Sequence, residues 1–225
     1  MDKITIILSA PRTGSTAYFY NIRKINEQAG AKIVSTLPWS AGSEFLFVKN
    51  SEITLSKRIE FLQKERENGN EWAFKVHYHQ LIDWKIIDWF YDFYKNHNIV
   101  RITRRNKWKW FLSWHFQECN KWALANINKH DQNKKLSWFN IDERISEMIN
   151  STYYRAYDQS IHKFFDMVNM FEQAKCSQTV YYEDIDFTNS NIVKLSDNIQ
   201  YEDYFFNIEQ LKRKFDETAA NRYNH

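Results

Sequence analysis

Residues 4–8, Ile-Thr-Ile-Ile-Leu, form a short, almost wholly apolar run that is followed at once by a turn of small residues. Such a run is typical of a strand that is buried on both faces of a parallel sheet. The turn ends near Ser15, where a helical pattern begins: Tyr18, Ile22 and Ile25 fall three or four positions apart and share one face. A buried strand that leads through a tight turn into a helix is typical of an α/β fold.

The alternation of apolar runs with helical patterns continues along the chain. Further strands are predicted at residues 72–76, 99–103 and 178–182, and helices at 15–28, 51–68, 81–94, 106–125, 141–171 and 208–218. This order predicts a central parallel sheet of about four to five strands with helices on its faces. The long helical stretch between the third and fourth strands is then an insertion before the last core strand. The chain contains no internal repeat and no linker-like segment. It is therefore predicted to form a single domain over residues 1–225.

Composition excludes several classes of protein. Aromatic residues make up 17% of the chain, which excludes a disordered polypeptide, and 4 Gly with 2 Pro argue against a loop-rich all-β fold. The formal net charge of +3 is low for a nucleic-acid-binding protein and favours a small anionic ligand. Two cysteines, Cys119 and Cys176, are too few for a disulfide framework or a four-cysteine metal site. Helical spacing favours core packing over ligand stacking for the aromatic set Trp108, Trp110, Phe111 and Trp114.

The sequence also bears on where the protein works. Met1-Asp2-Lys3 leads straight into the first apolar run, which is too short for the apolar core of a secretory signal. No apolar run approaches the ~18 residues that a helix needs to cross a bilayer. We therefore expect a cytoplasmic protein without a membrane span.

The turn Pro11–Thr16 has the residues of an anion-binding loop. The first amides of a helix point outward unpaired, and the helix dipole makes that end partly positive. Gly14 permits a positive φ and a close approach to the backbone, while Arg12 supplies a fixed charge that can grip an oxyanion with two nitrogens. The hydroxyls of Ser15 and Thr16 are further donors to an anion at this end of the helix.

A plainer alternative is that Ser15 or Thr16 only caps the helix and that Gly14 only turns the chain. An arginine in so tight a turn favours a bound anion over this alternative. The loop lacks the spacing Gly-x-x-x-x-Gly-Lys-Ser/Thr that is common to ATP-hydrolysing enzymes. Hydrolysis of ATP with magnesium is therefore disfavoured.

The segment Ser9–Thr16 resembles the 5′-phosphosulfate loop of sulfotransferases that use 3′-phosphoadenosine 5′-phosphosulfate (PAPS). Its arginine makes it more similar to the carbohydrate and protein-tyrosine branches of that family than to the cytosolic small-molecule branch, whose loop carries lysine. The resemblance implies a P-loop nucleotide-hydrolase-like fold, PAPS as co-substrate, adenosine 3′,5′-bisphosphate (PAP) as product, and no metal ion. By this resemblance the 5′-phosphate is held by Arg12, Thr13, Gly14, Ser15 and Thr16.

The third predicted strand resembles the family's 3′-phosphate site. It is followed by Arg104 and Arg105, and Ser113 comes eight positions after Arg105, as in the strand and helix that bind this phosphate in the family. Ligands of open α/β sheets bind at the carboxyl ends of the strands, where Arg105 would stand. The alternative is a solvated helix start with an incidental serine, although basic residues at a helix N-terminus oppose the dipole. The resemblance implies that Arg105 and Ser113 bind the 3′-phosphate.

Two weaker similarities occur in the same order along the chain. Phe74–His77 resembles the family's second strand, which ends in a lysine. Val180–Asp184 resembles the family's valine-x-tyrosine-glutamate-aspartate strand end, and this similarity implies that Tyr182 also binds the cofactor. Four successive matches at strand ends are more specific together than any one of them alone.

The resemblance implies in-line transfer of a sulfuryl group from PAPS to a hydroxyl or amine of a small-molecule or glycan acceptor. Arg12 would be catalytic, because it would stabilise the charge that develops on the leaving oxygen. Either of two residues could accept the proton of the acceptor. His77 follows the strand lysine by two positions, as the catalytic histidine of the cytosolic branch does, and Glu44 lies after the first helix, where the arginine-loop branches place a catalytic glutamate.

Both candidates for the base, Glu44 and His77, stay open at the level of sequence. Two alternative functions stay open as well. One is a P-loop kinase that acts on a small molecule, which would use ATP with magnesium. The other is a catalytically inactive nucleotide-binding or interaction protein, which would keep Arg12 and Arg105 but lack a working base.

Overall fold

The structure of the protein is a computed structural model that describes residues 5–28, 45–46, 54–69, 73–116, 157–185 and 208–223. The chain divides into two compact units. We call residues 1–105 with 170–193 the sheet unit, and residues 106–169 with 194–225 the aromatic unit. The interpretation of residues 1–225 as one sulfotransferase-like domain stays a prediction.

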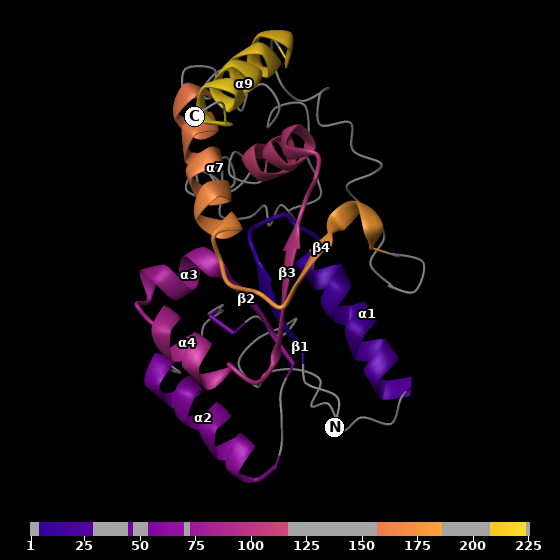
Figure 1. The fold of residues 1–225 in the computed structure, drawn as a ribbon, viewed down its shortest axis with the longest axis vertical. Helices are drawn as coiled ribbons and strands as arrows, with labels where there is room; N and C mark the ends of the chain where they lie inside the picture. The colour runs from indigo at the N-terminus through magenta and orange to yellow at the C-terminus, as the bar shows by residue number, and fades with distance from the viewer. Residues whose placement is uncertain are drawn as a thin grey trace, which may run out of the picture. The chain divides into compact units, whose positions relative to one another are not determined.

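The sheet unit contains a four-stranded sheet in which every strand is parallel to its neighbours (Figure 1). The strand order is β2-β1-β3-β4. The strands are β1 (Thr5–Ser9), β2 (Lys75–His77), β3 (Asn98–Thr103) and β4 (Gln178–Tyr181). This topology confirms the predicted α/β fold with a central parallel sheet flanked by helices.

The register brings the carboxyl ends of the four strands to one edge of the sheet. Ser9, the last residue of β1, pairs with His77 of β2 and with Ile102 of β3. Thr103 at the end of β3 pairs with Tyr181 at the end of β4. Loops that follow these strands therefore begin side by side, which is the arrangement that places ligand sites in open α/β sheets.

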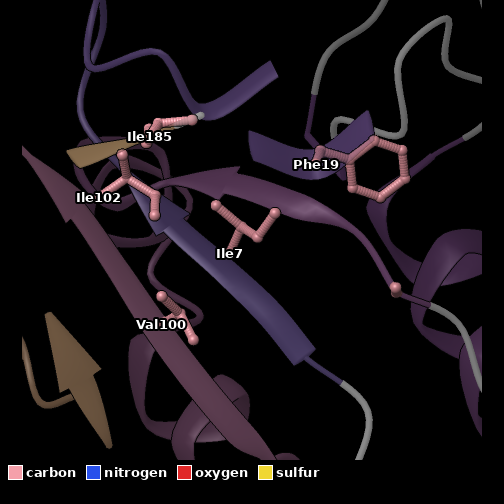
Figure 2. Close-up of a cluster of buried hydrophobic side chains, with 6 residues drawn as sticks. Ile7, Phe19, Val100, Ile102 and Ile185 are labelled. Atoms are coloured by element: carbon pink, nitrogen blue, oxygen red, sulfur yellow. The ribbon is translucent and has the colours of Figure 1, made fainter. Parts of the chain in front are cut away.

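Both faces of the sheet are buried, which explains the unbroken apolar run of β1. On one face Ile7 pairs in register with Val100, and these two pack with Ile102, Ile185 and Phe19 (Figure 2). Successive side chains alternate across a strand, so the neighbours of Ile7 serve the opposite face. These neighbours, Ile6 and Leu8, are completely buried.

Helices cover both faces. Helix α1 (Ser15–Gln28) begins and ends at the predicted residues and supplies Phe19 to the first face. Helix α2 (Leu55–Glu67) is shorter than the predicted 51–68, because the hydroxyl of Thr54 caps it by accepting a hydrogen bond from the amide of Lys57. Figure 1 shows α1 on one side of the strands and α3 (Tyr78–Asp83) with α4 (Ile87–Phe93) on the other.

The prediction of one helix over residues 81–94 is wrong, because α3 and α4 are separate helices. Lys85 has φ +55° and follows the last turn of α3. Its amide donates to the carbonyl of Ile82, and the amide of Ile86 donates to the carbonyl of Leu81. These two bonds form a Schellman motif, and Leu81 and Ile86 are both buried beside it. A lysine stands where such motifs usually have glycine, so the sequence carries no stop signal at this position.

We expect Lys85→Gly to stabilise the protein by about 0.5–1 kcal/mol, because the left-handed conformation costs a residue with a Cβ about 1–2 kcal/mol. Part of that gain is offset by the greater freedom of glycine in the unfolded chain. Urea denaturation measures the difference. Lys85→Ala is the matched control, since it removes the same side chain but keeps the Cβ. An equal gain in the two variants would contradict this explanation.

The described part of the aromatic unit consists of three helical segments. Residues 107–116 are helical, and the amide oxygen of Asn106 caps them by accepting from the amide of Lys109, as predicted. The other two segments are the part of α7 (Tyr157–Glu172) up to residue 169 and α9 (Ile208–Tyr223), which runs past its predicted end at 218. The predicted helical residues 117–125 and 141–156 lie outside the described part of the chain.

Aromatic rings form the core of this second unit. The ring of Trp110 meets that of Phe164 edge to face at 5.4 Å between centroids, and Phe111 lies 5.3 Å from Phe215. Trp110, Phe111 and Phe164 are all completely buried. Core packing, the role favoured by helical spacing, is therefore confirmed for Trp110 and Phe111.

His115 lies in the same core, with its ring stacked on that of Phe111 at 5.4 Å. It is 1% exposed, and this burial lowers the pKa of the imidazole to about 4. The folded state therefore resists a proton that the unfolded chain accepts near pH 6.5. The stability that neutral His115 permits is present above pH 6.5 and is lost as the pH falls towards about 4.

We expect the free energy of unfolding to fall by about 2 kcal/mol between pH 7 and pH 5 through His115 alone. His115→Phe is the control, because it keeps a ring beside Phe111 but cannot take up a proton. Urea denaturation at the two pH values should show a steeper loss in the wild-type protein than in this variant. Equal losses in both proteins would mean that His115 does not carry the pH dependence.

Candidate functional site

The loop after β1 has an unusual backbone. Arg12 has φ +66° and Gly14 has φ +78°. Left-handed backbone is uncommon for a residue with a side chain, and such strain gathers at ligand sites. The hydroxyl of Thr13 donates to the carbonyl of Ala10 at 2.8 Å, which closes the turn. Helix α1 then starts at Ser15, and the side chain of Arg12 stays exposed.

Gly14 is in close contact with Tyr182, which follows the last residue of β4. A Cβ at position 14 would lie 2.8 Å from Cε2 of the Tyr182 ring and closer still to Cδ2. No side chain fits between these two residues. The ring of a residue 168 positions later in the chain therefore holds the loop at its glycine.

Strand β2 brings two further polar side chains to the loop. Lys75 is buried, and its Nζ donates to the hydroxyl of Thr16 in the first turn of α1 at 2.9 Å. His77 lies at the end of β2, and its Nδ1 is 3.0 Å from the hydroxyl oxygen of Ser9 at the end of β1. The ring of His79 stacks on that of His77 at 5.7 Å. The predicted base candidate on this strand thus borders the start of the loop.

Two arginines follow β3 and differ in their surroundings. Arg104 is buried, and its guanidinium lies over the ring of Tyr182 at 3.7 Å from the centroid. A cation on an aromatic face is a favourable contact, which gains strength when the pair is shielded from water. Arg104, Tyr182 and Gly14 therefore form a continuous series of contacts from the end of β3 to the loop.

Arg105 is held by the segment that follows β4. Both terminal nitrogens of its guanidinium donate to the carboxylate of Asp184, each at 2.6 Å. Its backbone amide donates to the carboxylate of Glu183 at 3.1 Å, and its guanidinium lies 4.1 Å from the ring centroid of Tyr181. The bonds to Arg105 lower the pKa of Asp184, and the same bonds raise the pKa of Arg105.

These contacts bring together most of the predicted site residues of the sheet unit. The loop from Arg12 to Thr16 touches the side chain of Lys75, the first residue of β2, and the ring of Tyr182, which follows β4. Arg105 follows the end of β3 on the same edge. Arg12, Arg104 and Arg105 come from this edge, and the Nζ of Lys75 reaches the first turn of α1 beside it. Cationic side chains of this kind are suited to phosphate groups.

For two other predicted site residues, the structure describes no position relative to this edge. Ser113 belongs to the aromatic unit, where it is completely buried, and its part in holding a 3′-phosphate beside Arg105 stays a prediction. Glu44 lies outside the described residues, although its neighbour Phe45 is described and packs on Phe74 at 5.1 Å. The choice between Glu44 and His77 therefore stays open.

Two contacts of the site were not predicted from the sequence. The bidentate pair between Arg105 and Asp184 joins residues 79 positions apart, and the contact of Tyr182 with Gly14 is longer still in sequence. The signal that could have found them is the segment Tyr182–Asp184, which places a ring and two carboxylates directly after β4. Such a segment at the edge of a parallel sheet faces the loops of its neighbours.

The aromatic unit has a shallow groove of its own, with a volume of about 540 Å³. It is lined by Trp108, Ile208, Glu209, Lys212, Arg213, Asp216 and Glu217. The charges along it pair with one another within α9: Lys212 donates to Asp216 at 2.5 Å, and Arg213 lies 3.9 Å from Glu217. Such i,i+4 pairs are typical of a solvated helix face.

Among the helices in the described ranges, none combines the length and the apolar character that crossing a bilayer requires. The chain matches no protein-family model, no curated protein and no solved structure.

Proposed function

We propose that the chain is a sulfotransferase that transfers a sulfuryl group from PAPS to a hydroxyl or amine of an acceptor, with carbohydrates as one acceptor class. The observation that carries the proposal is the meeting of four motif-bearing strand ends at one edge of a parallel sheet. Each of these strand ends resembles the corresponding segment of the sulfotransferase family. Their convergence supports a single ligand that contacts several of them.

In this proposal the 5′ end of the nucleotide lies at the loop after β1. Arg12 and the amides from Thr13 to Thr16 hold the 5′-phosphate, and the bond from Lys75 to Thr16 supports a second positive charge beside it. Tyr182 contacts the nucleotide from the end of β4. A PAPS molecule carries several negative charges, and the cationic side chains at this edge complement them.

The 3′-phosphate lies at Arg105 in this proposal. This phosphate distinguishes PAPS from ATP, because the ribose of ATP has a free hydroxyl at its 3′ position. A guanidinium with two parallel N–H groups suits such an oxyanion geometrically as well as electrostatically. The 3′-phosphate site therefore carries the specificity of the proposed enzyme for its co-substrate.

Transfer is an in-line displacement at sulfur. The acceptor oxygen or nitrogen forms a bond to sulfur while the bond from sulfur to the 5′-phosphate oxygen breaks, so that PAP leaves with the electron pair. Arg12 stabilises the charge on the leaving oxygen. The proton of the acceptor goes to His77 or Glu44. Because positioning and charge stabilisation dominate such transfers, the protein needs little covalent chemistry of its own.

The first test uses the product nucleotide. We expect PAP at a hundred times its Kd to raise the free energy of unfolding by about 2.7 kcal/mol, and ATP with Mg²⁺ to change it little. Thermal melting measures both. Adenosine 5′-monophosphate is the control that lacks the 3′-phosphate, and it should stabilise less than PAP. Equal stabilisation by PAP and by ATP with Mg²⁺ would favour the small-molecule kinase instead.

Transfer itself is tested with sulfur-labelled PAPS and a panel of glycans, phenols, lipids and peptides. Appearance of label in one acceptor class, dependent on Arg12, would establish the reaction and identify the class. Binding of PAP without transfer to any acceptor would favour the inactive nucleotide-binding protein.

A further inference from the structure

The guanidinium of Arg105 is occupied by a carboxylate from the same chain. Its Nη1 and Nη2 donate to the two oxygens of Asp184, both at 2.6 Å. This is the parallel, two-bond geometry in which arginine binds carboxylates and phosphates alike. The carboxylate of Asp184 therefore stands where two oxygens of a phosphate would stand if Arg105 bound one end-on.

The ion pair between Arg105 and Asp184 can open without a large loss of stability. Both side chains are 53% exposed, and exposed pairs contribute little to stability because water screens them. Arg105 also keeps two contacts that do not involve Asp184: its guanidinium lies over the ring of Tyr181, and its amide is bound by Glu183. The guanidinium would thus stay in place if the carboxylate moved away.

The charges at this point oppose an incoming anion. Glu183 and Asp184 bring two negative charges to the single positive charge of Arg105. A phosphate that enters the guanidinium fork must displace Asp184 and then bear the repulsion of both carboxylates. A dianion gains more from the guanidinium than the carboxylate it displaces, whereas a ligand without a group at this position gains nothing.

We infer that Asp184 is an internal competitor for the anion site on Arg105, and that it lowers the affinity of that site for a phosphate dianion. The inference rests on the proposed function, in which Arg105 receives the 3′-phosphate. Asp184 occupies the fork in the ligand-free protein and leaves it when the nucleotide binds. Nucleotides without the 3′-phosphate leave the pair of Arg105 and Asp184 intact. Their affinity therefore does not depend on the charge of Asp184.

The test compares two isosteric variants of neighbouring residues by isothermal titration calorimetry. Asp184→Asn removes the charge from the fork, and we expect it to bind PAP about fivefold more tightly than the wild-type protein does. Its affinity for adenosine 5′-monophosphate should not change. Glu183→Gln is the matched control, since it removes an adjacent charge outside the fork and keeps an acceptor for the amide of Arg105. We expect it to change the affinity for PAP less than twofold.

The direction in which Asp184→Asn changes the affinity for PAP decides whether the inference holds. Weaker binding of PAP by Asp184→Asn would overturn it, because Asp184 would then orient Arg105 instead of competing for it. An unchanged affinity, or an equal gain in Glu183→Gln, would overturn it as well. In each of these cases a wild-type preference for PAP over the monophosphate would leave the proposed function standing.

Inorganic phosphate separates the two proposals further, because its binding needs no nucleotide site. Titration followed by the NMR signal of the Arg105 side chain should show tighter phosphate binding in Asp184→Asn than in the wild-type protein. That result without any preference for PAP would support the inference and overturn the proposed function. If neither the wild-type protein nor Asp184→Asn binds PAP or phosphate at Arg105, the inference and the proposed function are both overturned.

Discussion

Gly14→Ala is expected to lower the free energy of unfolding by about 4 kcal/mol. Two costs combine at this position. Alanine at φ +78° is strained, and its Cβ would enter the ring of Tyr182. Either the loop or the ring must then move, so PAP binding should be lost together with stability. Urea denaturation and calorimetry measure the two effects.

Gly69→Ala separates the two costs. Gly69 has φ +73°, yet no atom in the described ranges lies within 4 Å of the place where its Cβ would stand. Its substitution should therefore cost about 1 kcal/mol, from backbone strain alone. Adding Tyr182→Ala to Gly14→Ala should recover the part of the loss that comes from the clash. Equal losses at positions 14 and 69 would show that the contact with Tyr182 does not constrain the loop.

Arg105→Ala is expected to abolish the preference for PAP over adenosine 5′-monophosphate, a loss of about a hundredfold in relative affinity. The reason is that the two nucleotides differ only in the 3′-phosphate, and Arg105 is its proposed ligand. Affinity for the monophosphate should stay within about twofold. Calorimetric titration of both nucleotides gives the ratio directly.

Arg101→Ala is the control for this experiment. Arg101 lies on β3, the strand that precedes Arg105, and its guanidinium donates to the carbonyl of Glu172 and to the hydroxyl of Thr179. Its loss should lower stability and leave the nucleotide preference as it is. A preference for PAP that survives Arg105→Ala would mean that another residue reads the 3′-phosphate.

The first strand and the first helix could be predicted closely because their sequence signals are local. The apolar run, the small-residue turn and the helical spacing occur within residues 4–28, and the observed β1 and α1 follow them within one residue. Strand β2 was predicted less well, at 72–76 instead of Lys75–His77. The bounds of a strand depend on its partner, and Lys75 is the first residue of β2 to find one, in Ile7 of β1.

The site divides in the same way. The loop residues and the place of Arg105 after β3 follow from patterns of a few neighbouring residues, so the sequence predicts where they stand. The capture of Arg105 by Asp184 depends on how β4 lies beside β3, which no local pattern contains. The break at Lys85 was missed for a different reason, since a lysine there adopts a conformation that usually indicates glycine.

The contact between Gly14 and Tyr182 has a consequence for the order of synthesis. A ribosome adds Tyr182, the aromatic neighbour of the loop, 168 residues after Gly14. Until β4 has emerged and joined the outer side of β3, the nascent chain has the loop without the ring that confines it. The loop is therefore confined only after β4, the last strand of the described sheet along the chain, has been made.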